Sequence, residues 1–433
     1  MQPKTMPPLP ASISASVDDA VIQRKIASII GEICEGLASR LSIQPKAIVL
    51  TGSFARGEGS VLATPNGFRV LGDMEYMVVF PMGVNRGPLQ EFLDRQAKQL
   101  KAELASQEVD CDLEFRAITS EYFLALRPQL FGYELLAHGR TVWGDASILS
   151  GIPKFPKEAI PRWDAWRMLN NRIIEQLESA DRIPACDPNK LLQIYYQLIK
   201  CHIDLATTLL VFAGKYESTY AARSKALAKW ASEAGAQPNL GFLRPLAEKV
   251  AACTAYKLDP NAAPNPLAVR TDAREIEMFR NDLNRALTDL VPLVREIWRW
   301  EAAAFSGAMG IQDASDRALQ SAVLRSQPIG EKFRGWAKLM LMPTTRKEKG
   351  YWSRFSRLVF RGSPRYLVYG VAAQLYFAMP LVLSDQPNSD DLAGLDSLLP
   401  VRFEENESER RMWWRLRGDV LKSWRVFLRT HFA

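Results

Sequence analysis

Apolar residues in the first third of the chain follow one helical pattern and then several short patterns typical of strands. Helical spacing covers 17–41 and again 88–107. The strand-like segments are 46–50, which runs into a turn at 51–54, then 73–80, 109–115 and 139–145. Helices that alternate with short strands in this order predict a small mixed α/β domain within roughly the first 150 residues.

Beyond residue 153 the pattern changes to long amphipathic helices. They are expected at 160–182, 188–214, 218–235, 270–306 and 312–326. We therefore predict an α+β fold, with a small mixed-sheet core followed by a large all-helical region. The predicted divisions are a loose leader at 1–16, the core at 17–150, a helical domain at 151–330 and a basic, aromatic-rich helical region at 331–433, with a Pro- and Asn-rich linker at 258–268.

The amino-acid composition excludes several kinds of chemistry but says little about the fold. The chain has 433 residues, a net charge of +7, five scattered Cys without a CxxC pair and three His. These counts argue against a zinc ribbon, a disulfide scaffold and histidine-centred catalysis. The leader has no apolar run after a basic start, so no secretory signal is expected and a cytoplasmic location fits best.

Two acidic residues stand inside an otherwise apolar strand pattern. Asp73 and Glu75 are two positions apart, so both side chains point to the same face of the strand. Adjacent like charges in this setting are costly without a cation. A pair of carboxylates suits Mg²⁺, which completes its octahedron with waters and substrate phosphates, and Mn²⁺ could take its place.

Two further features lie close to this pair in the predicted order of elements. Asp110, Asp112 and Glu114 share one face of the next strand, so a third carboxylate could reach the same edge of the sheet. Gly52 and Ser53 lie where the first strand passes into a helix, and glycine there permits close approach of the backbone to a phosphate. The amides at the start of that helix would face the phosphates.

A GS turn, a [DE]x[DE] strand and a third acidic strand, in this order, resemble the DNA polymerase β-like nucleotidyltransferase superfamily. The resemblance spans roughly residues 20–150. It implies a metal-dependent enzyme that moves a nucleoside monophosphate from an NTP such as ATP to a hydroxyl acceptor and releases pyrophosphate. Asp73 and Glu75 would bind the metals, Asp112 would bind the catalytic metal and accept the acceptor's proton, and Gly52 and Ser53 would hold the triphosphate.

The sequence departs from the family pattern in its spacing and leaves some assignments open. Asp73 follows Ser53 by 20 positions, which predicts an extra loop or hairpin at 60–70. The third carboxylate is assigned to Asp112, with Asp110 as the alternative. Arg56 and Lys200 are candidate phosphate ligands, and the competing interpretation of Lys200 is a solvated helix residue. The acceptor, whether RNA, a second nucleotide or another hydroxyl compound, is not specified.

The C-terminal region carries the excess of positive charge. Ten basic residues in 332–365 face one acid, Glu348; they are Lys332, Arg334, Lys338, Arg346, Lys347, Lys349, Arg354, Arg357, Arg361 and Arg365. Interleaved aromatic residues could stack on RNA bases, and the uncharged run at 366–384 could place 332–384 at an anionic membrane. A buried core helix is the favoured interpretation of that run. The alternative function is an inactive nucleotidyltransferase-like module that binds RNA or a membrane surface.

Overall fold

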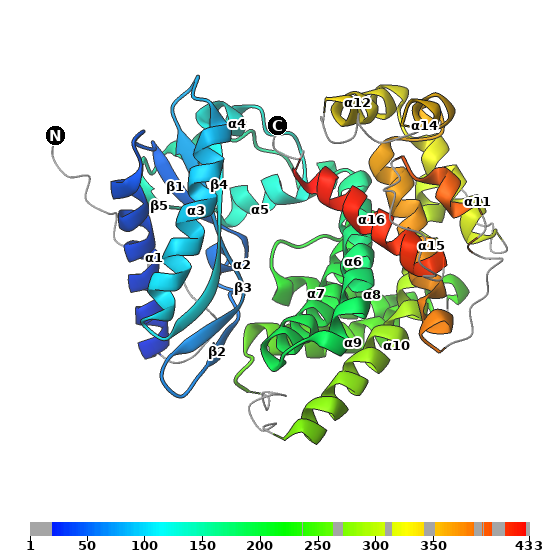
Figure 1. Ribbon diagram of the computed structural model, residues 1–433, viewed down its shortest axis with the longest axis horizontal. Helices are drawn as coiled ribbons and strands as arrows, with labels where there is room; N and C mark the ends of the chain where they lie inside the picture. The colour runs from blue at the N-terminus through cyan, green and yellow to red at the C-terminus, as the bar shows by residue number, and fades with distance from the viewer. Residues whose placement is uncertain are drawn as a thin grey trace. The chain divides into compact units, whose positions relative to one another are not determined.

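The computed structural model describes residues 20–235, 237–262, 272–307, 314–341, 351–384, 392, 394–400 and 412–429 (Figure 1). The chain divides into two compact units. The first unit contains Met1–Asp164, Ala213–Glu233 and Ala247–Val269, and the second contains Ala165–Phe212, Ala234–Leu246 and Arg270–Ala433. The units therefore differ from the contiguous ranges expected from the sequence, because two later segments fold into the first unit and the basic C-terminal region belongs to the second.

The first unit is built on a five-stranded mixed sheet. Its strands are β1 (Ala47–Thr51), β2 (Val61–Ala63), β3 (Phe68–Phe80), β4 (Val109–Thr119) and β5 (Arg140–Gly144). β3 pairs with β1 and β2 in antiparallel fashion and with β4 in parallel fashion, and β5 pairs with β1. The predicted α+β class and mixed sheet are confirmed. β3 begins five residues before the predicted 73–80 segment because it pairs with β2 in the hairpin that the long spacing implied.

Helices cover one face of the sheet, and short helical segments cover the other. Side chains of α1 (Ala20–Arg40) and α3 (Arg86–Ala105) pack against Met74, Tyr76 and Val78 of β3 (Figure 1). Met77 and Val79 point to the opposite face, where α4 (Ser120–Leu124) and α5 (Leu130–His138) pack. Burial on both faces explains the nearly continuous apolar sequence at the end of β3.

Segments distant in sequence complete the first unit. They carry most of α8 (Tyr220–Ala234) and most of α9 (Leu243–Leu258). Ser60 donates to the Lys257 carbonyl at 2.6 Å, and Asn261 donates to the Val61 carbonyl at 2.8 Å. These bonds hold the β2 hairpin against residues about 200 positions later. α9 was not predicted, since its small, alanine-rich face gives weak apolar periodicity.

The second unit is helical. Its helices include α6 (Arg162–Arg182), which begins in the first unit, α7 (Pro188–Phe212), α10 (Ala273–Ser306), α11 (Asp316–Ser326), α12 (Ile329–Met340), α14 (Tyr351–Leu358), α15 (Pro364–Leu383) and α16 (Met412–Arg429). The predicted helices at 160–182, 188–214, 270–306 and 312–326 correspond to α6, α7, α10 and α11. The leader at 1–16 and most of the linker at 258–268 lie outside the described residues.

α15 is the uncharged segment that raised the question of a membrane. Its length and composition would allow a membrane span, but 61% of its most apolar window is buried inside the protein. Val368, Val371 and Leu375 are fully buried. Burial of this extent supports a core helix of the second unit.

Candidate functional site

The turn after β1 brings the backbone directly against an acidic side chain of β3. Gly52 opens the short helix α2 (Gly52–Ala55) with φ +65°. A Cβ atom at this position would lie 2.9 Å from the carboxyl carbon of Glu75. Thr51 pairs with Glu75 across the two strands, and its hydroxyl donates to the Glu75 carbonyl at 3.3 Å. Only glycine combines this φ with such a close approach to a neighbouring side chain. The local backbone geometry therefore explains why the GS turn requires glycine at position 52.

Asp73 and Glu75 lie on the same face of β3, as predicted. The neighbouring Met74 and Tyr76 are buried in the core under α1 and α3, so alternation along the strand places the two acids on the opposite face. Asp73 is exposed and Glu75 is partly exposed. Apolar burial of the alternate positions therefore holds both carboxylates at a surface of the sheet.

β4 adds acids to that face in register. Asp112 pairs with Asp73, and Glu114 pairs with Glu75. Residues paired across two strands point to the same side of a sheet, so these four acids share one face. Asp110 instead pairs with Arg69 across an irregularity in the register and forms an ion pair with it at 3.1 Å. Of the two candidates for the third carboxylate, the register places Asp112 beside Asp73.

Basic partners reach the two acids of β4. Lys101 of α3 forms a hydrogen-bonded ion pair with Asp112, and this bond raises the pKa of the lysine. Arg116 donates to Glu114 at 2.6 Å. Within the described part of the chain, no three His, Cys, Asp or Glu side chains lie close enough together to hold a metal ion. The donor set of Asp73 and Glu75 nevertheless fits Mg²⁺, which commonly takes only one or two carboxylates from the protein.

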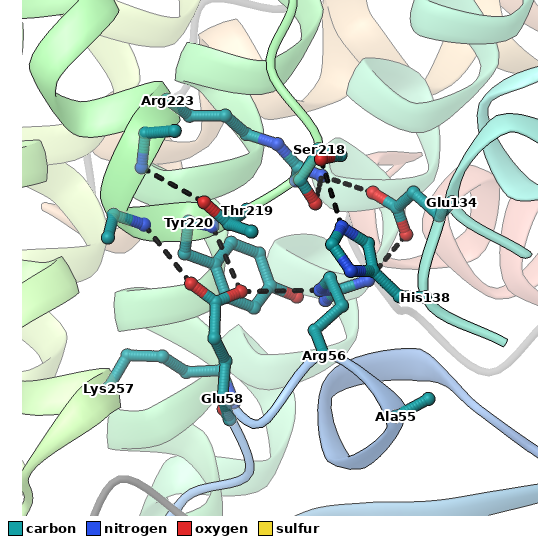
Figure 2. Close-up of polar contacts among 12 residues, drawn as sticks. Ala55, Arg56, Glu58, Glu134, His138, Ser218, Thr219, Tyr220, Arg223 and Lys257 are labelled. Atoms are coloured by element: carbon teal, nitrogen blue, oxygen red, sulfur yellow. Dashed lines mark hydrogen bonds and ion pairs between the residues drawn. The ribbon is translucent and has the colours of Figure 1, made fainter. Parts of the chain in front are cut away.

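A buried ion network holds the segment that follows the GS turn (Figure 2). Arg56 has a side chain only 3% exposed, and its guanidinium bonds Glu134 of α5 at 2.5 Å and Glu58 at 3.3 Å. Arg223 of α8 bonds the other oxygen of Glu134, and Tyr216 donates to that oxygen at 2.6 Å. Burial by itself would raise the pKa of Glu134, but Arg56 and Arg223 outweigh it and hold the pKa at about 2.

The same network closes the first turn of α8. Glu58 accepts from the backbone amides of Tyr220 at 3.0 Å and Ala221 at 3.2 Å, which satisfies two amides that the helix itself cannot bond. The ring of Tyr220 lies 4.6 Å from the Arg56 guanidinium. The Arg56 guanidinium thus contacts Glu58, Glu134 and the Tyr220 ring. Its predicted role as a phosphate ligand stays a prediction.

His138 lies at the edge of this network. Its Nε2 atom is 2.9 Å from the Ser218 hydroxyl (Figure 2). Burial, and then the charge of Arg56, lower the pKa of the imidazole. This shift favours the neutral ring, and the tautomer decides whether His138 or Ser218 donates the hydrogen bond between them.

Sequence reasoning did not find Glu58, Glu134 and Arg223. A basic and an acidic residue separated by 78 or 89 positions carry no local signal, since only the tertiary fold brings Glu134 to Arg56 and Arg223 to the same carboxylate. The signal that did exist was Arg56 directly after the GS turn. Its function in the fold is to tie that turn to α5 and α8.

Lys200 belongs to α7 in the second unit, whereas the other predicted residues belong to the first. The Glu175 carboxyl is close enough that Lys200 acts on its pKa, which burial raises and the charges of Arg172 and Lys200 lower. Its described environment therefore includes an acidic residue of the same unit. A role in phosphate binding stays a prediction.

Several of the basic C-terminal residues bond the backbone of their own unit. Lys332 donates to the Phe360 carbonyl at 3.3 Å, Arg354 to the Asp396 and Leu399 carbonyls at 3.0 Å each, and Arg357 to the Ser397 carbonyl at 3.3 Å. Arg346, Lys347 and Lys349 lie outside the described residues. Part of the positive charge therefore stabilises loops.

Comparison with known proteins adds no assignment to this geometry. No family model, no curated protein and no solved structure matches the chain.

Proposed function

We propose that the chain is a Mg²⁺-dependent nucleotidyltransferase that transfers a nucleoside monophosphate from an NTP to a hydroxyl acceptor. The observation that carries this proposal is the close approach of the Gly52 backbone to the Glu75 carboxylate, which leaves no room for a Cβ atom. It joins the GS turn and the acidic strand, two sequence features 20 positions apart, into one local arrangement. The resemblance to the DNA polymerase β-like superfamily depends on that arrangement.

Asp73 and Glu75 are the proposed metal ligands. They leave most of an octahedral shell to waters and to phosphate oxygens of the NTP. When bound, Mg²⁺ would neutralise charge on the triphosphate. The turn at Gly52 and Ser53 would lie against the phosphates. Tying this turn to α5 through Arg56 and Glu134 would keep its backbone in place during binding.

Asp112 is the proposed proton acceptor. In the reaction, the acceptor oxygen forms a bond to the α-phosphorus, the bond to pyrophosphate breaks, and the hydroxyl proton passes to the carboxylate. Asp112 has the register position for this role beside Asp73. Its ion pair with Lys101 must then loosen when substrate and metal bind.

Label transfer from α-³²P NTPs tests the proposal. The purified full chain is incubated with each NTP, with Mg²⁺ or Mn²⁺, and with a panel of acceptors that includes total RNA and nucleotides. Label transfer and pyrophosphate release should fall by at least about 1000-fold in the Asp73→Asn plus Glu75→Gln variant, since both proposed metal ligands lose their charge.

The matched control is Glu91→Gln plus Glu121→Gln, which removes two charges elsewhere in the first unit. Its activity should equal that of the wild type. Absence of label transfer from a folded protein, with every NTP and both metals, would contradict the proposed transferase activity. Binding of RNA or anionic vesicles without turnover would then favour the inactive module.

A further inference from the structure

A cavity of about 470 Å³ lies within the second unit, whereas the acidic face of the sheet belongs to the first. Its walls come from α11, from the turn at 360–361, from α15 and from the segment 394–398. This volume is within the range of pockets that hold small molecules. None of the residues already discussed as metal or phosphate ligands lines it.

The polar part of the cavity wall is basic. Arg317, Arg325 and Arg361 line it, and the described lining contains no Asp or Glu. The nearby Asp316 of α11 is buried and forms ion pairs with Arg295 and Arg299, so its charge is already balanced. Within the described residues, the side chains of Arg325 and Arg361 form no ion pair. An arginine guanidinium can bind phosphate oxygens through two parallel hydrogen bonds.

The rest of the wall is apolar and includes an accessible aromatic ring. Leu324, Leu367 and Leu398 form part of it, together with Phe360. Phe360 is 73% exposed, and its ring meets that of Phe333 edge to face with centroids 5.8 Å apart. An exposed aromatic ring directly before a cavity-lining arginine offers a stacking surface beside a phosphate partner.

We propose that this cavity binds a nucleoside phosphate, with the base against Phe360 and the phosphates at Arg325 and Arg361. Charge complementarity argues for the anion, and the ring and leucines argue for an apolar, flat body attached to it. The cavity belongs to the second unit, whereas Asp73 and Glu75 belong to the first. The proposed binding site can therefore be tested independently of the proposed transferase activity.

Isothermal titration calorimetry of ATP binding to the full chain tests this site. The measurement uses the Asp73→Asn plus Glu75→Gln background with EDTA, so that metal-dependent binding at the acidic face does not contribute. Arg325→Ala plus Arg361→Ala should weaken ATP binding at least tenfold, because charge-assisted hydrogen bonds to the phosphates are lost. The control Arg334→Ala plus Lys338→Ala removes two exposed charges of α12 outside the cavity and should leave the affinity unchanged.

A second variant blocks the cavity without altering its charge. Ser321 lines it from the exposed side of α11, so Ser321→Trp should also abolish ATP binding. No ATP binding in the background protein, or equal binding in all variants, would overturn the proposal. Binding of dodecyl phosphate with no binding of ATP would overturn the assignment to a nucleoside phosphate. Either result leaves the label-transfer assay of the wild type unaffected.

Discussion

Two charged regions of the first unit differ in how their charges are balanced. On the face of β3 and β4, Asp73, Glu75, Asp112 and Glu114 lie side by side at an accessible surface of the sheet. Behind the GS turn, Glu134 is enclosed by the guanidinium groups of Arg56 and Arg223. Removing one partner of a buried ion pair leaves an uncompensated charge inside the protein, which is strongly destabilising. On the acidic face, Asp112 and Glu114 have the basic partners Lys101 and Arg116, and the accessible carboxylates can also bind a cation from solution. The comparison predicts that mutations in the network change stability and mutations on the acidic face change activity.

Neutralising Glu134 should have the largest effect on stability. Glu134→Gln leaves two buried guanidinium groups with fewer carboxylates, so the unfolding free energy should fall by about 3 kcal/mol. Chemical denaturation at neutral pH measures this change. Glu103→Gln is the control, since Glu103 pairs with Arg40 in a partly exposed bridge whose loss should cost at most about 1 kcal/mol. Equal losses in the two variants would contradict the structural role of the network.

Acid should weaken the same network. The pKa of Glu134 is held at about 2, below the ordinary value of 4.5 for a glutamate. A lowered pKa in the folded state gives stability that is complete above about pH 4.5 and is lost as the pH falls toward 2, amounting to about 3 kcal/mol. The unfolding free energy, measured by chemical denaturation at several pH values between 5 and 2, should therefore fall more steeply with decreasing pH for the wild type than for Glu134→Gln. If the unfolding free energies of the two proteins fall equally with decreasing pH, Glu134 is not the group responsible for the loss of stability in acid.

Adding one methyl group at Gly52 should affect both stability and activity, because Gly52 lies in the GS turn and close to Glu75 of the acidic face. Gly52→Ala should cost about 1–2 kcal/mol from the left-handed backbone and should also displace the Glu75 carboxylate. Gly83→Ala is the matched control, because Gly83 has φ +78° but no atom within 4 Å of the added Cβ. If Gly52→Ala destabilises the protein no more than Gly83→Ala and keeps full label transfer, the close approach of Gly52 to Glu75 has no function.

Removing Lys101 should have the smallest effect on stability. Lys101→Ala breaks an exposed ion pair, so the unfolding free energy should change by less than about 1 kcal/mol. Because the lysine then no longer competes for Asp112, the Mg²⁺ concentration for half-maximal label transfer should fall. Lys98→Ala on the same helix is the control. A rise in the required Mg²⁺ would argue against Asp112 as a participant.

Much of the first unit was predictable because its signals are local. The apolar segments that became α1, β1, α3, β4 and β5 follow periods of 3.6 or 2 residues, and these periods depend on neighbouring positions only. The 20-position spacing between Ser53 and Asp73 also predicted the β2 hairpin. The shared face of Asp73 and Glu75 follows from the same alternation.

Tertiary structure alone decided which residues from distant segments meet. The sequence favoured Asp112 over Asp110 as the third carboxylate but left both open, because which of them lies beside Asp73 depends on the register of a parallel strand pair. It could not assign residues 213–233 and 247–269 to the first unit, or bring Glu134 and Arg223 to Arg56. Local periodicity is encoded residue by residue, whereas long-range pairing results from the packing of the whole chain.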